Sequence, residues 1–183
     1  MCGFLYSNNK NAKAINFDKI LEARGGDQSD ELNIDIHTFY HNRQIYSGNS
    51  ENGRQPVYIK SINSVLLYNG EIYNFEYLRD INYFNKEIRN DTEILLRLYL
   101  KEGIQFVSKL KGMFAFAIWD KRIKKLYLVR DRFGIKPLYK FNVGNKLFFG
   151  SEPKSIFEQG VKRKINLSSI KNYIRNGILE DNK

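Results

Sequence analysis

Polar and apolar residues alternate most clearly between Leu32 and Tyr40, and this period of two predicts one half-buried strand over residues 32–40. His37 and His41 fall on this strand and at its end, with no catalytic partner in view. Short apolar runs bounded by polar or glycine-bearing segments predict further strands. These lie at residues 2–6, 57–59, 65–68, 113–119, 126–129, 137–143 and 147–149.

A helical period predicts the remaining elements. Asn16 is a candidate N-cap for a helix that ends at Gly25-Gly26. The clearest helix covers residues 91–102, with Asp91 as its N-cap and Gly103 as its stop. The other predicted helices cover residues 75–81, 151–157 and 167–174.

Turn and loop signals divide these elements. Asn69-Gly70 is a turn dipeptide directly after an apolar strand, and Gly144-Asn145-Lys146 predicts a hairpin. Residues 47–55 are polar and unpatterned, which is typical of a loop that serves as a lid. Along the chain, the predicted elements come in the order strands, two helices, consecutive strands and short helices. This order indicates antiparallel sheets covered by helices, an α+β protein.

Composition narrows the class of protein. The 183 residues are enough for one domain with a proper core, and 42% hydrophobic residues indicate a globular fold. A single cysteine excludes a disulfide framework, and with two histidines it argues against a zinc site. No run reaches the about 18 apolar residues of a membrane span, and the N-terminus lacks the layout of a secretory signal. We expect a soluble, cytoplasmic protein that does not bind a membrane.

The net charge of +10 leaves one alternative open. Basic clusters at residues 121–125 and 162–164 would suit a nucleic-acid-binding protein. Both clusters fall at predicted turns, and no motif combines aromatic and basic residues. We therefore interpret the charge as solvated surface and expect no nucleic-acid partner.

The lone cysteine is the second residue, which gives it distinctive chemistry. Removal of Met1 before this small residue would leave Cys2 with a free α-amine beside its thiol. The unperturbed pKa of such an amine is about 7.7–8.0 and that of a thiol about 8.5, so the amine can serve as the local base. The alternative is that Cys2 is a small apolar residue at the start of a buried strand.

A series of motifs then appears in a fixed order. These are Cys2-Gly3-Phe4, Arg24-Gly25-Gly26-Asp27, His41-Asn42-Arg43, Gln55-Pro56, Asn69-Gly70-Glu71-Ile72-Tyr73-Asn74, Asp91-Thr92-Glu93, Gly112-Met113-Phe114-Ala115-Phe116-Ala117, Arg130-Asp131-Arg132-Phe133-Gly134-Ile135-Lys136-Pro137-Leu138-Tyr139 and Ser151-Glu152. Over about residues 2–157 the chain resembles the glutaminase domain of asparagine synthetase. That domain is a class II glutamine amidotransferase of the N-terminal nucleophile hydrolase superfamily. The resemblance implies a four-layer αββα sandwich of two antiparallel sheets between helical layers.

The resemblance also implies hydrolysis of L-glutamine to glutamate and ammonia, and a role for each matching residue. Cys2 is the expected nucleophile, and Asn69 and Gly70 are the expected oxyanion hole, which suits paired hydrogen-bond donors. Arg43 is expected to bind the substrate carboxylate as a bidentate fork. Glu71 and Asp91 are expected to bind its α-ammonium. Taken singly, Arg43 could be a surface charge, Asn69-Gly70 a hairpin turn and Asp91 a helix cap.

Some positions depart from the family pattern. Gly26 stands where the family usually has proline, and Asn42 and Gln44 replace the usual neighbours of the substrate arginine. Three functions stay open: a glutaminase for asparagine synthesis, an amidotransferase for another carboxylate acceptor, and a non-catalytic glutamine-binding module.

The resemblance divides the chain into a glutaminase domain at 1–157 and an extension at 158–183 that leads toward a synthetase domain. No residues match the ATP-binding loop of such a domain. We therefore expect no cofactor or metal in this chain, with ATP and Mg²⁺ used only by a synthetase domain or subunit that receives the ammonia. Association into a homodimer is left open.

Overall fold

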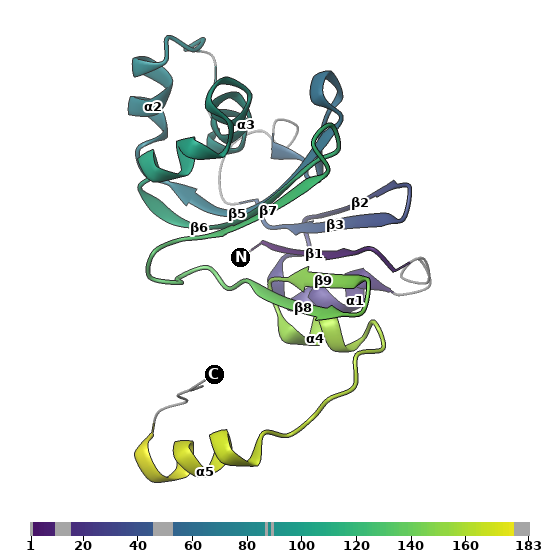
Figure 1. Ribbon diagram of the computed structural model, residues 1–183. Helices are drawn as coiled ribbons and strands as arrows, with labels where there is room; N and C mark the ends of the chain where they lie inside the picture. The colour runs from purple at the N-terminus through teal and green to yellow at the C-terminus, as the bar shows by residue number, and fades with distance from the viewer. Residues whose placement is uncertain (1, 10–15, 46–52, 87, 89, 178–183) are drawn as a thin grey trace.

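The computed structural model describes residues 2–9, 16–45, 53–86, 88 and 90–177, which form two stacked β-sheets with helices on their outer faces (Figure 1). The first sheet has the strand order β2-β3-β1-β9-β8, and all its neighbouring strands are antiparallel. Its strands are β1 (Gly3–Ser7), β2 (Gln28–Ile34), β3 (His37–Arg43), β8 (Tyr139–Val143) and β9 (Lys146–Gly150).

The second sheet has the order β4-β5-β6-β7 and is also antiparallel throughout. Its strands are β4 (Val57–Ile59), β5 (Ser64–Ile72), β6 (Gly112–Asp120) and β7 (Lys125–Arg130). The short strand β4 pairs only with the first part of β5, at Ser64 to Leu66. The second half of β5 therefore has no strand on its β4 side among the described residues.

Helices cover the outer faces, which confirms the predicted four-layer αββα arrangement. The helices α2 (Phe75–Ile81) and α3 (Asp91–Glu102) lie on the second sheet, and α1 (Phe17–Leu21) and α4 (Pro153–Phe157) lie on the first (Figure 1). The last helix, α5 (Leu167–Asn176), has no buried residue and stands apart from the sheets. Short 3₁₀ helices cover Glu22–Arg24, Lys60–Ile62 and Gly103–Lys109.

Successive side chains of each strand point to opposite faces of the sheet, so each sheet has buried apolar residues on both faces. Phe4 and Tyr6 of β1 pack between the sheets, while Leu5 between them packs against α1. On β5, Leu67 faces the other sheet, and Tyr68 faces α2 and α3. Asn69 therefore shares the face of Leu67, in the layer between the two sheets.

The bounds of α2 and α3 agree with the prediction, as do the β6–β7 turn and the β8–β9 hairpin. The predicted strand at 137–143 begins later, at Tyr139, and the predicted helix at 151–157 begins at Pro153. Most of the predicted lid loop at 47–55 lies outside the described residues, and its residues 53–55 form no strand. The domain boundary after residue 157 coincides with the end of α4 and stays a prediction.

The prediction of one strand over residues 32–40 was wrong, because this segment is a hairpin. The strands β2 and β3 pair with Ile34 opposite His37, and Asp35 and Ile36 form the turn. Asp35 has a φ of 54°, which aspartate tolerates better than most residues. The turn changes the phase of the alternation, so Phe39 joins Leu32 in the core between the sheets.

Two local predictions in the motif region were also wrong. Asn69 and Gly70 do not form a turn but lie inside β5, opposite Ala115 and Phe114 of β6. The N-cap of α3 is Asn90, whose side chain accepts the backbone N–H of Glu93, and Asp91 is the first helical residue. Both differences release the side chains of Asn69 and Asp91 for other contacts.

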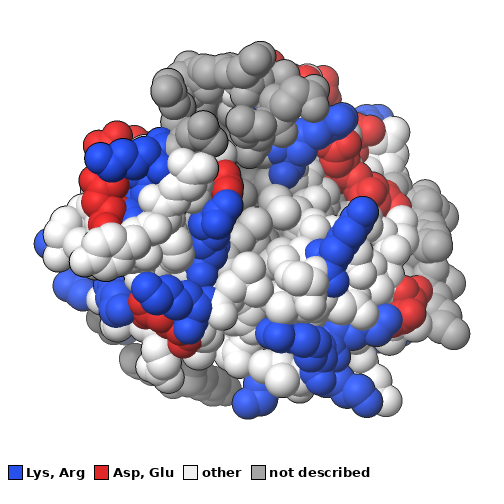
Figure 2. All heavy atoms as spheres, turned by 90° about the horizontal axis from the view of Figure 1, so that it is seen from above, with Lys and Arg blue, Asp and Glu red and all other residues white. Residues whose placement is uncertain are grey.

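The interpretation of the positive charge as solvated surface stays a prediction. On the face shown in Figure 2, lysine and arginine side chains lie in several separate groups, with acidic side chains beside some of them. Ion pairs such as Arg122 with Asp120 and Lys121 with Asp35 involve the first basic cluster. In the part of the chain that the structure describes, no helix combines the length and the apolar character that crossing a membrane requires.

Candidate active site

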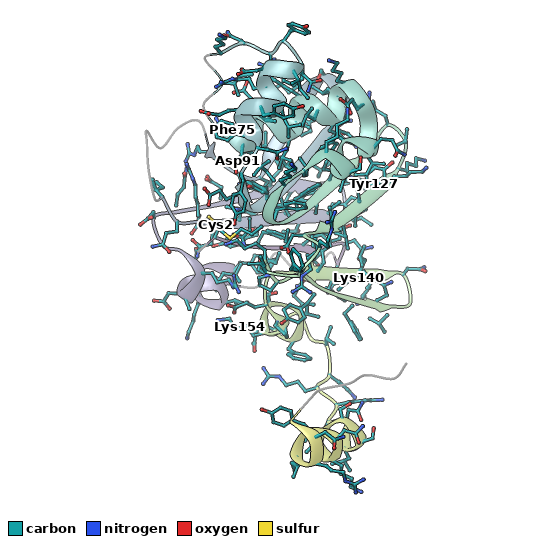
Figure 3. The ribbon with its side chains drawn as sticks, turned by 90° about the vertical axis from the view of Figure 1, so that its left-hand side faces the viewer. Cys2, Phe75, Asp91, Tyr127, Lys140 and Lys154 are labelled. Carbon is teal, nitrogen blue, oxygen red and sulfur yellow. The ribbon has the colours of Figure 1, made fainter. Side chains whose placement is uncertain are left out.

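One cavity of about 650 Å³ brings together all six residues that the sequence singled out. They come from the start of β1, the end of β3, the second half of β5 and the first turn of α3. In Figure 3, Cys2 lies below Phe75 and Asp91 on the same side of the molecule, and all three line this cavity. The cavity-lining residues predicted from the sequence are Cys2, Arg43, Asn69, Gly70, Glu71 and Asp91.

The thiol of Cys2 is free and half-buried, and it rests against the end of β3. The backbone N–H of Gln44 donates to Cys2 Sγ at 3.4 Å, and Sγ lies 3.7 Å from the carbonyl oxygen of Gln44. Because both contacts use the backbone of Gln44, the unusual side chain at this position does not alter them.

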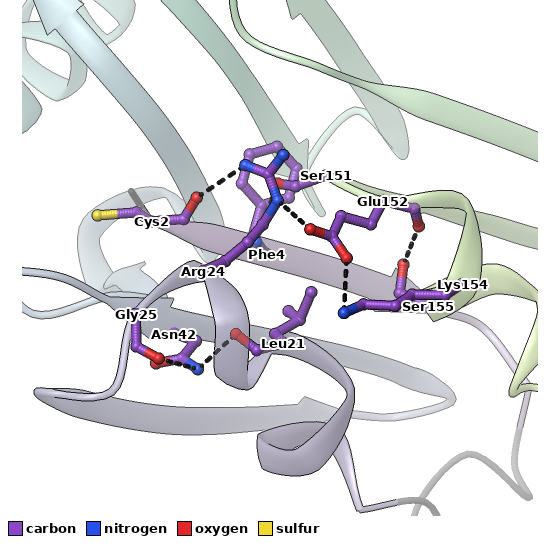
Figure 4. A network of polar contacts seen from close by, with 10 residues as sticks. All are labelled: Cys2, Phe4, Leu21, Arg24, Gly25, Asn42, Ser151, Glu152, Lys154 and Ser155. Atoms are coloured by element: carbon purple, nitrogen blue, oxygen red, sulfur yellow. Dashed lines mark hydrogen bonds and ion pairs between the residues drawn. The ribbon is translucent and has the colours of Figure 1, made fainter.

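An ion-pair network holds the main chain of Cys2 (Figure 4). Arg24 Nη1 donates to the carbonyl oxygen of Cys2 at 3.5 Å, and Arg24 Nε lies 2.7 Å from Glu152 Oε1. Lys154 Nζ is 2.9 Å from the other oxygen of Glu152. Burial would raise the pKa of Glu152, but its bonds to Lys154 and Arg24 hold that pKa below its usual range. Arg24 and Glu152 both lie in motifs of the sequence, but the motifs do not indicate this contact.

Asn42, one of the departures from the family pattern, holds the segment that carries Arg24. Its Nδ2 donates to the carbonyl oxygens of Leu21 and Gly25, at 3.1 and 3.0 Å (Figure 4). Asn42 is 2% exposed. The substitution therefore supplies two buried hydrogen bonds behind the site.

Asn69 carries the most informative polar group of the cavity. Its side chain is buried at 3% exposure, yet its Nδ2 has no hydrogen-bond partner among the described residues. An unpaired buried donor costs about 1–3 kcal/mol, so each one calls for an explanation. A ligand oxygen inside the cavity would supply the missing acceptor.

The backbone N–H of Gly70 lies beside this amide. The N–H of Phe114, the partner of Gly70 on β6, donates to Asp131 Oδ2, and the carbonyl oxygen of Phe114 accepts the N–H of Asp131. Both groups of Phe114 thus point away from β5, so the N–H of Gly70 points away from β6. Two other N–H groups lie on that open edge of β5, two residues before and two residues after Gly70. The N–H of Tyr68 donates to Gln55 Oε1, and the N–H of Ile72 donates to Asp91 Oδ2. No described group accepts from the N–H of Gly70 between them.

Glycine is required at position 70 by close packing. A Cβ atom there would lie 2.3 Å from the carbonyl oxygen of Met113 and 2.7 Å from Phe114 Cα. Both are backbone atoms of β6 and cannot move without separating the strands. Gly70 therefore permits the tight β5–β6 pairing that keeps its own N–H beside Asn69.

Charged groups line the remainder of the cavity. Asp91 Oδ2 accepts from the hydroxyl of Tyr68 and from the backbone N–H of Ile72, which ties α3 to β5. Glu71 is exposed, and Arg43 is half-buried with its Nη1 3.4 Å from Gln28 Oε1. The site thus offers two carboxylates and one guanidinium within one cavity, which matches an amino acid in its zwitterionic form.

Among the other residues that line the cavity, Gln55 and Lys136 were assigned no role from the sequence, although both lie in its motifs. Lys136 is 9% exposed, and no described residue bonds to its ammonium group. The loop that carries it is held by Asp131, whose carboxylate accepts backbone N–H groups, including those of Ile135 and Lys136. Burial raises the pKa of Asp131, but these N–H groups together lower it below its usual range.

No group of three or more histidine, cysteine, aspartate or glutamate side chains among the described residues is arranged to hold a metal ion.

Comparison with solved structures identifies the fold. Glutamine phosphoribosylpyrophosphate amidotransferase from Bacillus subtilis superposes with a TM-score of 0.70 at 20% sequence identity, over 87% of this chain and 44% of that enzyme. This chain therefore shares with that enzyme a fold of two antiparallel sheets between helices.

The chain belongs to the family of glutamine amidotransferase domains, whose model matches residues 1–183. Asparagine synthetase [glutamine-hydrolyzing] 2 of Bacillus subtilis is 38% identical over 133 residues, 72% of this chain and 18% of that protein. Asparagine synthetase [glutamine-hydrolyzing] 1 of the same organism is 34% identical over 186 residues, 95% of this chain and 29% of that protein. The chain is homologous to the glutamine-hydrolysing part of these enzymes and spans less than a third of their length.

Proposed function

We propose that this chain hydrolyses L-glutamine to glutamate and ammonia, with Cys2 as the nucleophile. The observation that carries this proposal is the unpaired Nδ2 of Asn69 in the same cavity as the thiol of Cys2. A purely structural asparagine in this buried position would have its donor satisfied by the protein.

In the first half of the reaction, the sulfur of Cys2 forms a bond to the side-chain carbonyl carbon of glutamine. The carbonyl π electrons move to oxygen, and the oxyanion accepts from Asn69 Nδ2 and the N–H of Gly70. The α-amine of Cys2, once Met1 is removed, takes the thiol proton and delivers it to the leaving nitrogen. The C–N bond breaks and ammonia departs, leaving a thioester on Cys2.

In the second half, water attacks the thioester through the same oxyanion arrangement. The C–S bond breaks, glutamate is released and the thiol is restored. Arg43 binds the α-carboxylate of the substrate, and Glu71 and Asp91 bind its α-ammonium. These charged contacts lie away from the bond that breaks, so they select and orient the substrate.

The ammonia would serve an amidation of the asparagine synthetase type. The support is homology to two such synthetases over most of this chain. ATP and Mg²⁺ would be used by the synthetase domain or subunit that receives the ammonia, and this chain would need no cofactor for glutamine hydrolysis. Association into a homodimer is compatible with this role.

The test is release of glutamate from glutamine by the purified chain, with its N-terminal residue determined. We expect turnover by the chain that begins with Cys2, and none by Cys2→Ala. A chain that begins with Cys2 and binds glutamine without turnover would overturn the proposal and leave a glutamine-binding module.

A further inference from the structure

His41 is a completely buried histidine that links the two sheets. It lies on β3 opposite Phe4, two residues after Cys2 along β1. Its Nε2 is 3.0 Å from the carbonyl oxygen of Tyr68 on β5, the residue before Asn69. One side chain therefore joins the part of the fold that carries the nucleophile to the strand that carries the oxyanion donors.

The direction of this hydrogen bond follows from its partner. A carbonyl oxygen only accepts, so Nε2 must carry the proton and donate. Burial lowers the pKa of His41 to about 4, so its imidazole is neutral near neutral pH and Nδ1 is bare. Nδ1 is also buried and has no partner among the described residues.

An imidazole with one unpaired buried nitrogen is poorly suited to a role in packing alone. An apolar side chain would fill the space between the sheets without burying an unpaired nitrogen. The bond made by Nε2 is the feature that an apolar residue could not supply. Its target, the Tyr68 carbonyl, belongs to the same planar peptide unit as the N–H of Asn69.

Tyr68 is held from other directions as well. Its N–H donates to Gln55 Oε1 at 2.6 Å, and its hydroxyl donates to Asp91 Oδ2. His41 adds the only one of these contacts that comes from the sheet containing β1. Its bond to Tyr68 therefore adds one directional contact to the apolar packing between the sheets, whereas Gln55 and Asp91 fix the strand against its own layer.

We propose that His41 is a positioning residue of the glutaminase reaction, whose Nε2–H···O=C bond to Tyr68 places the oxyanion donors of β5 relative to Cys2. This inference rests on the proposed function. It predicts a defect in the chemical step, because misplacement of the donors weakens stabilisation of the oxyanion more than it weakens substrate binding.

Two amide variants separate the bond from simple packing. In His41→Gln the amide nitrogen reaches the position of Nε2, and in His41→Asn the amide ends near Nδ1 and falls short of Tyr68. We expect His41→Asn to lose about tenfold to a hundredfold in kcat with KM changed by only about twofold. His41→Gln should recover most of that loss.

Two controls accompany the pair. Alkylation of Cys2 by iodoacetamide forms no oxyanion, so its rate should be unchanged in both variants. His37→Asn removes the other histidine of β3, which bonds to Tyr6 within its own sheet, and it should keep normal kcat. All assays are run below the unfolding temperature of the least stable variant.

Equal kcat values for His41→Asn and His41→Gln would reject the role of His41 while leaving the glutaminase assignment intact. A parallel loss in kcat and in Cys2 alkylation would also reject it, because that result indicates a general disturbance. A wild-type chain without glutaminase activity would overturn the proposed function, and this inference with it.

Discussion

Asn69 shows how one unpaired side chain can carry a functional assignment. Leu67 and Tyr68, which precede it on β5, bury apolar groups or complete their hydrogen bonds, whereas its amide lines the cavity without an acceptor among the described residues. An acceptor that arrives with the substrate would satisfy this group, as we propose. The sequence placed this residue in a turn, where the same amide would be solvated and carry no such information.

We predict that Asn69→Ala loses about 10²–10³-fold in kcat, the usual effect of removing one oxyanion donor. Its stability should stay near normal, because the alanine leaves no broken protein hydrogen bond. Asn69→Asp should be no better, since a carboxylate repels the oxyanion. Steady-state kinetics and thermal unfolding measure both effects.

The matched control is Asn74→Ala, just beyond the same strand. Asn74 bonds to the backbone of Lys109 and Lys111 and does not line the cavity, so its loss should lower stability and spare kcat. A few-fold effect or less on kcat in Asn69→Ala would move the oxyanion role elsewhere.

His41 also predicts a pH dependence of stability. Burial lowers its pKa to about 4 in the folded protein, against about 6.5 in an unfolded chain. Between these values the unfolded chain binds the proton and the folded protein does not. The contribution of His41 to stability is therefore fully present above pH 6.5 and is lost as the pH is lowered toward 4. His41 alone should lower the free energy of unfolding by about 2 kcal/mol between pH 7 and pH 5.

Urea unfolding at the two pH values tests this expectation. His41→Gln should show a smaller loss of stability than wild type by about that amount. An equal pH dependence in the two proteins would contradict a buried neutral imidazole at this position.

At the scale of elements, the end of β5 positions the site. Beyond the short strand β4, the edge of β5 is completed by the side chains of Gln55 and Asp91, with the N–H of Gly70 left between them. A strand edge that is partly capped in this way offers one donor at a fixed place. The cavity is therefore built from rigid sheet rather than from a turn.

Gly70→Ala should break this arrangement, since its Cβ would meet backbone atoms of β6 at 2.3 and 2.7 Å. Overpacking of this kind costs about 1–3 kcal/mol or more, and activity should fall with it. Gly26→Ala is the control, because a Cβ there meets no atom within 4 Å. Equal unfolding temperatures for Gly70→Ala and wild type would contradict the packing described for β5 and β6.

The elements also show what the sequence could predict. The bounds of α2 and α3 followed from the helical period, and the end of α3 also from Gly103, which are local signals. The β2–β3 hairpin was missed because Asp35-Ile36 lacks the usual turn glycine and the alternation on its two sides reads as continuous. Asn69-Gly70 was misplaced for the opposite reason, since a turn dipeptide lies inside a strand.

At the scale of the whole molecule, the predicted site residues lie together because two sheets meet there. The motifs identified Cys2, Asn69 and Asp91, and the six selected positions all line one cavity. The tasks of Arg24, His41 and Gln55 could not be read from the sequence. Each depends on contact with a segment distant in the chain, and periodicity carries no information about such pairing.

The central claim is that Cys2, freed of Met1, is the nucleophile for glutamine. The most direct measurement is the intact mass of the protein before and after reaction with a glutamine-like affinity label, followed by mapping of the labelled peptide. We predict a chain that begins with Cys2 and carries one label, on Cys2, with glutaminase activity lost in proportion. A label on another residue, or full glutamate release from a chain that retains Met1, would contradict the account.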